Sequence, residues 1–147
     1  MKIVYVDIPC ATDADIIELL KLNNWPEYKD IHHVTRAIKN SPHLVMAFDV
    51  DNNTKLVGMT RTVSDDAWSA YIDCLLVHPD YQNQHIGTQL IKRLIKRIKS
   101  ELYITVAPNN PETIPFYEKL GFSLLPGTTI LQINNKERML NERRKRK

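Results

Sequence analysis

A change of hydrophobic period near residue 86 constrains the fold of this chain more than any other feature. Residues 68–77 are dense in isoleucine, leucine, valine and tyrosine and stop at Pro79, which predicts a buried strand. From Ile86 the apolar residues recur at helical spacing through Leu90 to Ile98, with lysines and arginines on the opposite face. A buried strand therefore leads through a polar loop into an amphipathic helix.

Shorter patterns predict the other elements. Apolar runs predict strands at 1–8, 43–49, 55–63 and 102–106, and helical spacing predicts helices at 12–22, 31–39 and 112–120. Two further apolar segments, 122–125 and 129–133, are expected to be closing strands. We therefore expect an α+β fold, with a mixed sheet of roughly six to seven strands flanked by about four helices.

Length and composition favour a single domain. The 147 residues, 43% of them hydrophobic, suffice for one core and are too few for two ordinary domains, so we expect a domain over 1–134 and a tail over 135–147. No apolar run approaches the roughly 20 residues that span a bilayer, and a cytoplasmic protein is expected. Cys10 and Cys74 lack the spacing of metal ligands, so no metal cofactor is expected.

The tail differs from the rest of the chain in charge. Residues 136–147 contain seven lysines and arginines and two acidic residues, whereas the remainder is slightly acidic. An acidic body argues against a broad nucleic-acid surface, so nucleic acid is not an expected partner. The tail is interpreted as a solvated end, with contact to an acidic partner or to RNA left open.

The polar loop at 78–88 is the first candidate binding site. Successive backbone amides at a strand–loop–helix junction point into one concavity, and the N-terminus of the following helix adds partial positive charge. An anionic cofactor, in particular one with a pyrophosphate, is the natural occupant.

Two motifs resemble the signatures of the GNAT superfamily of N-acetyltransferases. The pyrophosphate-binding signature is Gln or Arg, any two residues, Gly, any one residue, then Gly or Ala. In the loop, Gln82 matches its first position and Gly87 its last, but His85 stands where the first glycine is usual. If that position needs a positive φ, histidine can adopt it at a cost of roughly 1–2 kcal/mol; if it does not, only the backbone N–H matters. The run from Asn110 through Tyr117 to Glu-Lys-Leu-Gly-Phe resembles the second signature.

The resemblance implies acetyl-CoA as co-substrate and a sheet whose strands at 68–77 and 102–106 splay apart. The pantetheine arm would enter the gap and bond to the strand backbone, as an added strand does at an open sheet edge. The implied cofactor-binding residues are Leu75, Leu76, Val77, Gln82, Asn83, Gln84, His85, Ile86, Gly87, Thr88, Asn110 and Tyr117.

Direct acetyl transfer to an amine needs a proton donor for the departing thiolate. Tyr117 is the candidate, because a phenol with a pKa near 10 stays protonated at neutral pH. Asp73 is the candidate for deprotonating the amine, directly or through water, and strand alternation puts it on one face with Tyr71, Leu75 and Val77. The alternative for Tyr117 is an aromatic residue that only packs against the sheet, and the alternative for Asp73 is a strand carboxylate that only makes hydrogen bonds.

The acceptor is expected to be a primary amine of a small molecule, since no segment resembles an added peptide-binding domain. A protein acetyltransferase acting on a lysine or an N-terminus, and a non-catalytic CoA-binding module, are the alternatives. The His32-His33 pair lacks a partner carboxylate and is interpreted as surface, and a homodimer through the segment 129–133 is left open. The candidate substrate-binding residues are Trp25, Tyr28, Arg61 and Tyr71.

Overall fold

The computed structural model of the chain describes residues 1–108, 110–128, 130–135 and 142–146. Its strands are β1 (Ile3–Val6), β2 (Leu44–Asp49), β3 (Lys55–Ser64), β4 (Ser69–Val77) and β5 (Tyr103–Val106). Its main helices are α1 (Asp13–Leu22), α2 (Ile31–Lys39), α3 (Ile86–Ile98) and α4 (Ile114–Lys119). Short 3-10 helices precede α2, α3 and α4: η1 (Pro26–Asp30), η2 (Pro79–Tyr81) and η3 (Pro111–Thr113). The predicted α+β class is confirmed.

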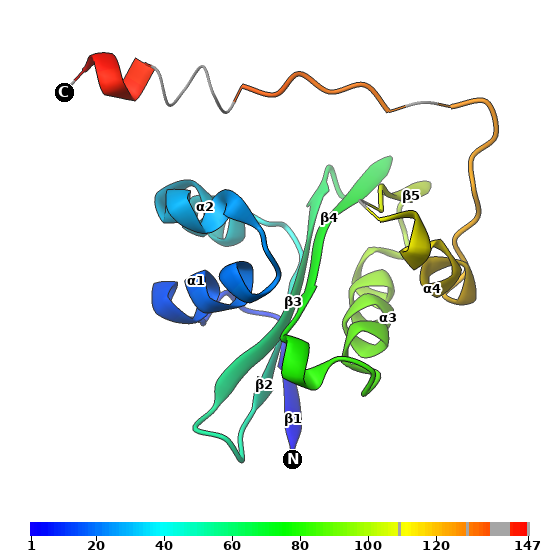
Figure 1. The fold of residues 1–147 in the computed structure, drawn as a ribbon. Coiled ribbons are helices and arrows are strands. Elements are labelled where there is room, and N and C mark those ends of the chain that lie inside the picture. The colour runs from blue at the N-terminus through cyan, green and yellow to red at the C-terminus, as the bar shows by residue number, and fades with distance from the viewer. Residues whose placement is uncertain (109, 129, 136–141, 147) are drawn as a thin grey trace.

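One mixed sheet organises the molecule. Its strands lie in the order β1-β2-β3-β4-β5, antiparallel except for the parallel pair β4–β5. Figure 1 shows α1 and α2 on one face of the sheet and α3 and α4 on the other. A separate apolar cluster fills the space on each face, so the two layers of helices are held independently.

The prediction of six to seven strands was wrong for the described residues, which form five. Residues 122–125 and 130–133 form no strand, and residue 129 lies outside the described part. Apolar content predicts that a segment will be buried but does not determine which strand it pairs with. The side chains of Leu124, Leu125, Ile130, Leu131 and Ile133 are exposed.

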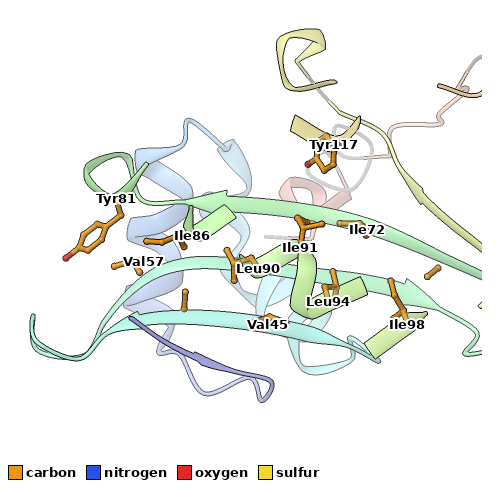
Figure 2. Packing of buried hydrophobic residues seen from close by; sticks show 12 residues of the cluster. Val45, Val57, Ile72, Tyr81, Ile86, Leu90, Ile91, Leu94, Ile98 and Tyr117 are labelled. Atoms are coloured by element: carbon orange, nitrogen blue, oxygen red, sulfur yellow. The ribbon is translucent and has the colours of Figure 1, made fainter. Parts of the chain in front are cut away.

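Helix α3 has the strongest packing, in agreement with its sequence period. Its residues Leu90, Ile91 and Leu94 have no exposed surface, and they lie in a row against the strands in Figure 2. The first helix likewise begins where its sequence predicts, because Thr12 Oγ1 accepts a hydrogen bond from the backbone N–H of Asp15 at 3.2 Å. No helix in the described ranges is long and apolar enough to cross a membrane.

The C-terminal part of the chain includes the described residues 130–135 and 142–146. Residues 130–135 run along the top of the view in Figure 1, and residues 142–146 lie above α2 in that view. Arg143 there contacts Asp30 at the end of η1, with Nη1 3.1 Å from Oδ1. Part of the tail that the sequence predicts to be solvated is therefore in contact with the body.

Candidate functional site

Half of strand β4 has an open edge. The parallel pairing with β5 covers Ser69–Ile72, and beyond it the strand continues to Val77 with a neighbour on the β3 side only. The carbonyl of Cys74 accepts a hydrogen bond from Thr60 Oγ1 at 2.6 Å, so Cys74 faces β3. By alternation, Leu75 and Val77 direct their N–H and C=O groups toward the open side. The edge can therefore accept an extended ligand as an additional strand.

The loop at 82–88 closes one end of this edge. His85 is the N-cap of α3 and has φ 62° and ψ 13°, and Asn83 has φ 62° as well. The position where the usual glycine is replaced thus does require the left-handed conformation, which histidine tolerates better than most residues. No side chain caps the start of α3, so its first amides are directed at the loop and can bind an anion.

Side-chain hydrogen bonds fix the loop to the sheet. Tyr81, just before the loop, donates its hydroxyl to Asp49 Oδ2 at 2.8 Å, and Gln82 Nε2 donates to the carbonyl of Val77 at 3.3 Å. The hydrogen bond from Tyr81 is the main reason that the pKa of Asp49 lies below its ordinary value. Sequence analysis missed this link, because no local pattern connects a carboxylate on β2 with a tyrosine after β4.

Gly87 shows why the last position of the signature is small. A Cβ there would lie 3.7 Å from Phe116 Cζ and 3.7 Å from Val77 Cγ2, which is ordinary van der Waals contact. Alanine therefore fits, whereas a longer side chain would meet β4 and α4. The start of α3 is held close to the open edge of β4, so an anion site and a strand-accepting edge adjoin.

A cavity of about 240 Å³ lies on the other face of the sheet, between η1, α2 and the strands. Apolar side chains form most of its lining, and Glu27, His33, Arg61 and Asp73 bring charge or hydrogen bonding to it. Of the four predicted substrate-binding residues, Trp25 and Arg61 line it; the further lining residues are Leu20, Val34, Ala37, Ile38, Met59, Cys74 and Leu76.

Asp73 lies in this cavity because of a β-bulge. Arg61 pairs with Cys74 but Thr62 pairs with Ile72, so Asp73 is the additional residue of β4. The prediction that Asp73 shares a face with Leu75 and Val77 was wrong. Simple alternation does not allow for an inserted residue: Leu75 and Val77 pack on the α3 side, while Asp73 lines the cavity.

Asp73 is paired with a cation that is itself oriented. Arg61 Nη1 donates to Asp73 Oδ2, and Arg61 Nε donates to Ser41 Oγ at 2.7 Å. The guanidinium is therefore fixed between α2 and β4. Since it engages one carboxylate oxygen of Asp73, the other oxygen can accept a hydrogen bond from a ligand in the cavity.

Tyr117 belongs to the α3-side cluster and lies above Ile91 and Ile72 in the view of Figure 2. Its ring makes edge contacts with Phe116 and Phe122, at centroid distances of 5.0 and 5.7 Å. Burial, and then the charge of a Cys74 thiolate, raise the pKa of Tyr117, so its hydroxyl stays protonated at neutral pH. Burial raises the pKa of Cys74 to about 12.

Three other predicted residues do not line the cavity and have local roles. Asn110 Oδ1 accepts from the N–H of Glu112 at 3.0 Å, which caps η3. Tyr28 packs on the α1–α2 cluster beneath Lys21 and Lys29, and Tyr71 is partly exposed on β4. No group of three or more potential metal-binding side chains occurs in the part of the chain that is described.

Comparisons with known proteins agree with this arrangement. Residues 13–122 match the profile of the family described as "Acetyltransferase (GNAT) family". The chain is 33% identical over 128 residues to the uncharacterized N-acetyltransferase ycf52 of Pyropia yezoensis, covering 82% of this chain and 73% of that protein. The fold is similar to that of a GNAT-family acetyltransferase from Streptococcus pneumoniae, with a TM-score of 0.77, 24% identity, and coverage of 92% and 100%.

A third relative is informative about acceptors. The chain is 33% identical over 90 residues to the ribosomal protein bS18 alanine N-acetyltransferase of Escherichia coli, covering 57% of this chain and 59% of that protein. The chain spans less than two thirds of the length of several such relatives, for example 55% of ycf52 from Porphyra purpurea.

Proposed function

The chain belongs to the GNAT acetyltransferase family, which uses acetyl-CoA, and we propose that it transfers the acetyl group directly to a primary amine of a small molecule held in the cavity at Asp73. One observation carries the proposal: the open edge of β4 adjoins the anion-binding start of α3, and the inserted residue of the same strand lines the cavity. Cofactor and acceptor sites thus meet along one strand.

The residues around the open edge fit the proposed cofactor. The left-handed turn at His85 and the uncapped amides of α3 suit a pyrophosphate, and the outward backbone groups of Leu75 and Val77 suit an amide-containing arm. When bound, acetyl-CoA supplies an activated thioester. The backbone N–H of Val77 would polarise its carbonyl.

Direct transfer is favoured over a relay through the protein. The buried Cys74 thiol is the nucleophilic group nearest the acceptor cavity, but with a pKa near 12 it stays protonated at neutral pH. The Tyr117 hydroxyl can instead donate its proton toward the departing thiolate, since its raised pKa keeps that proton available. The aromatic contacts of its ring fix the direction of the hydroxyl.

Asp73 would hold the acceptor and remove its proton. A carboxylate with one oxygen on Arg61 can accept a hydrogen bond from the acceptor ammonium through the other. The proton can then leave the amine for this oxygen directly or through a water molecule. The pairing with Arg61 keeps the carboxylate in one orientation, which positions the nitrogen lone pair.

The cavity size supports a small acceptor group. About 240 Å³ lies slightly below the roughly 300–1,000 Å³ of pockets that enclose a whole drug-sized ligand. The alternative, a protein N-terminus or lysine, is favoured by the relative that acts on ribosomal protein bS18, and only the amine-bearing end of such a chain would enter. A non-catalytic CoA-binding module remains the third hypothesis.

Titration with CoA followed by an amine panel separates these hypotheses. We expect CoA to bind with micromolar affinity, and thiol release from acetyl-CoA to depend on small monoamines, diamines or amino sugars more than on peptides. A peptide-only response would favour the protein acetyltransferase, and binding without turnover would favour the CoA-binding module. No heat and no thermal stabilisation at millimolar CoA would contradict the cofactor site.

Replacement of one carboxylate tests the acceptor site. Asp73→Asn should raise the KM for the amine about 10- to 100-fold, the range for a lost charge-assisted hydrogen bond, with the affinity for CoA unchanged. Asp51→Asn, at an exposed carboxylate in the β2–β3 turn, is the matched control. Equal kinetics of the two variants would remove Asp73 from the acceptor site.

A further inference from the structure

The rim of the acceptor cavity carries an ionic contact that the proposed chemistry does not use. His33 lines the cavity, and its Nδ1 lies 3.0 Å from Oδ1 of Asp30. Arg143, from the tail, contacts both: its Nη1 lies 3.1 Å from Asp30 Oδ1 and its Nη2 lies 2.7 Å from His33 Nδ1. We call Asp30 and His33 the rim site.

The rim site can bind a cationic hydrogen-bond donor with only one tautomer of a neutral His33. Nδ1 of His33 either donates to Asp30 or accepts from Arg143, because a ring nitrogen cannot do both. With Arg143 bound, the proton of a neutral imidazole lies on Nε2, and Asp30 receives its hydrogen bond from the guanidinium. Without Arg143, Nδ1–H can donate to Asp30. Occupation by a cation therefore switches the tautomer.

The charge of the site favours a cation. Burial raises the pKa of Asp30, but its contacts with His33 and then with Arg143 outweigh burial, so the pKa lies below its ordinary value and Asp30 is ionised at neutral pH. Glu27 adds negative charge to the lining of the same cavity, where the charge of Asp73 is already paired with Arg61. A basic tail beside a slightly acidic body follows the same complementarity.

We propose that the rim site binds a second cationic group of the acceptor, and that Arg143 occupies this site in cis and competes with the acceptor. The proposal rests on the proposed acetyl transfer at Asp73. It narrows the acceptors to amines that carry another positive charge within reach of the cavity mouth. A diamine and a peptide with a basic side chain both have this chemistry.

The kinetic test compares matched acceptors in the full-length chain and in a full-length variant that lacks one positive charge. Arg143→Gln should lower the KM about two- to fivefold for a dicationic acceptor, the size expected for an exposed charge pair, with kcat unchanged. The KM for an acceptor lacking the second charge should not change. The pairs are 1,5-diaminopentane against pentylamine, and Ala-Arg-Gly-Gly against Ala-Gln-Gly-Gly; whichever pair responds identifies the source of the cation.

Two further variants distinguish the rim site from general charge. Asp30→Asn should raise the KM for the dicationic acceptor and abolish the effect of Arg143→Gln in the double variant. Arg144→Gln removes the same charge one residue away and should change nothing. Equal effects of Arg144→Gln and Arg143→Gln, or equal effects on both members of each acceptor pair, would overturn the proposal.

A spectroscopic measurement tests the docking without any turnover. In a ¹⁵N-histidine-labelled protein, the ring nitrogens of His33 should report a proton on Nε2 in the full-length chain and a shift toward Nδ1–H in Arg143→Gln. Unchanged His33 signals in that variant would overturn docking in cis. A tautomer shift in a protein that acetylates no amine would leave the docking intact while contradicting the proposed function.

Discussion

The two faces of the sheet differ in how completely their apolar side chains are enclosed. On the α3 face, Leu90, Ile91 and Leu94 are wholly enclosed, and the adjoining cofactor edge consists mainly of backbone amides and carbonyls. On the α1–α2 face, the packing leaves a cavity of about 240 Å³ whose polar groups are side chains. Recognition of a constant cofactor can thus be a property of the backbone, whereas recognition of an acceptor depends on residue identity.

The largest effect is expected where the two faces meet. Tyr117→Phe keeps the ring contacts and removes the hydroxyl, so kcat should fall about 10²- to 10⁴-fold, the range for a lost general acid. CoA affinity and melting temperature should stay near those of the parent. Steady-state rates at saturating acetyl-CoA measure the effect, and a variant that keeps more than about half the parent kcat would remove Tyr117 as the acid.

Truncation of one packed apolar side chain on each face tests the difference in closure. Leu90→Ala should lower the free energy of unfolding by about 2–5 kcal/mol, because it opens a void in an enclosed cluster. Val34→Ala, at the wall of the existing cavity, should cost less than about 1.5 kcal/mol, since it only enlarges a space already open. Urea unfolding of both variants gives the comparison; equal losses would contradict it.

Two glycines provide a finer test on the α3 face. A Cβ on Gly58 would lie 2.8 Å from Leu90 Cδ1, so Gly58→Ala should destabilise the protein by about 1–3 kcal/mol through overpacking. Gly87→Ala should leave stability and CoA affinity nearly unchanged, because its Cβ meets ordinary contacts. Thermal unfolding with and without CoA measures both. A loss of CoA affinity in Gly87→Ala alone would mean that the cofactor approaches this backbone more closely than expected.

The smallest effect is expected at the replaced signature glycine. His85→Gly relieves a left-handed backbone conformation that costs roughly 1–2 kcal/mol. It also stabilises the unfolded chain by about 0.4–1 kcal/mol, because glycine increases the conformational entropy of that chain. Stability should therefore rise by about 0–1.6 kcal/mol, and CoA affinity should be kept or improved. Asn83→Gly, at the same φ, is the control. A clear loss of affinity in His85→Gly alone would show that the imidazole contacts the cofactor.

Local features of the fold were predictable from the sequence to within a residue or two. The range 31–39 is that of α2, and the helix predicted from Ile86 is α3, because periodicity and turn residues act over short distances. The loop between β4 and α3 was predictable for the same reason, since one contiguous segment builds it. The sequence did not decide whether position 85 requires a positive φ, and the structure shows that His85 has one.

Features that join distant segments were not predictable. The acceptor cavity combines η1, α2, β3 and β4, and its carboxylate arrives there through a bulge that alternation cannot reveal. The contact of Arg143 with Asp30 spans a sequence separation of 113 residues, and no local pattern specifies it. The segment at 122–125, with its exposed Leu124 and Leu125, shows the converse limit, because apolar composition alone did not produce a strand.

The bulge in β4 makes the length of that strand as important as its composition. Before Asp73 the even-numbered residues face α3, as Ala70 and Ile72 do, and after it the odd-numbered ones do. If this stretch paired by simple alternation with its number of residues unchanged, the last part of the strand would be inverted and Leu75 and Val77 would turn toward the cavity. A side-chain substitution around the cavity leaves this arrangement intact, whereas an inserted or deleted residue of β4 beyond the bulge would exchange the two faces of the strand that follow it.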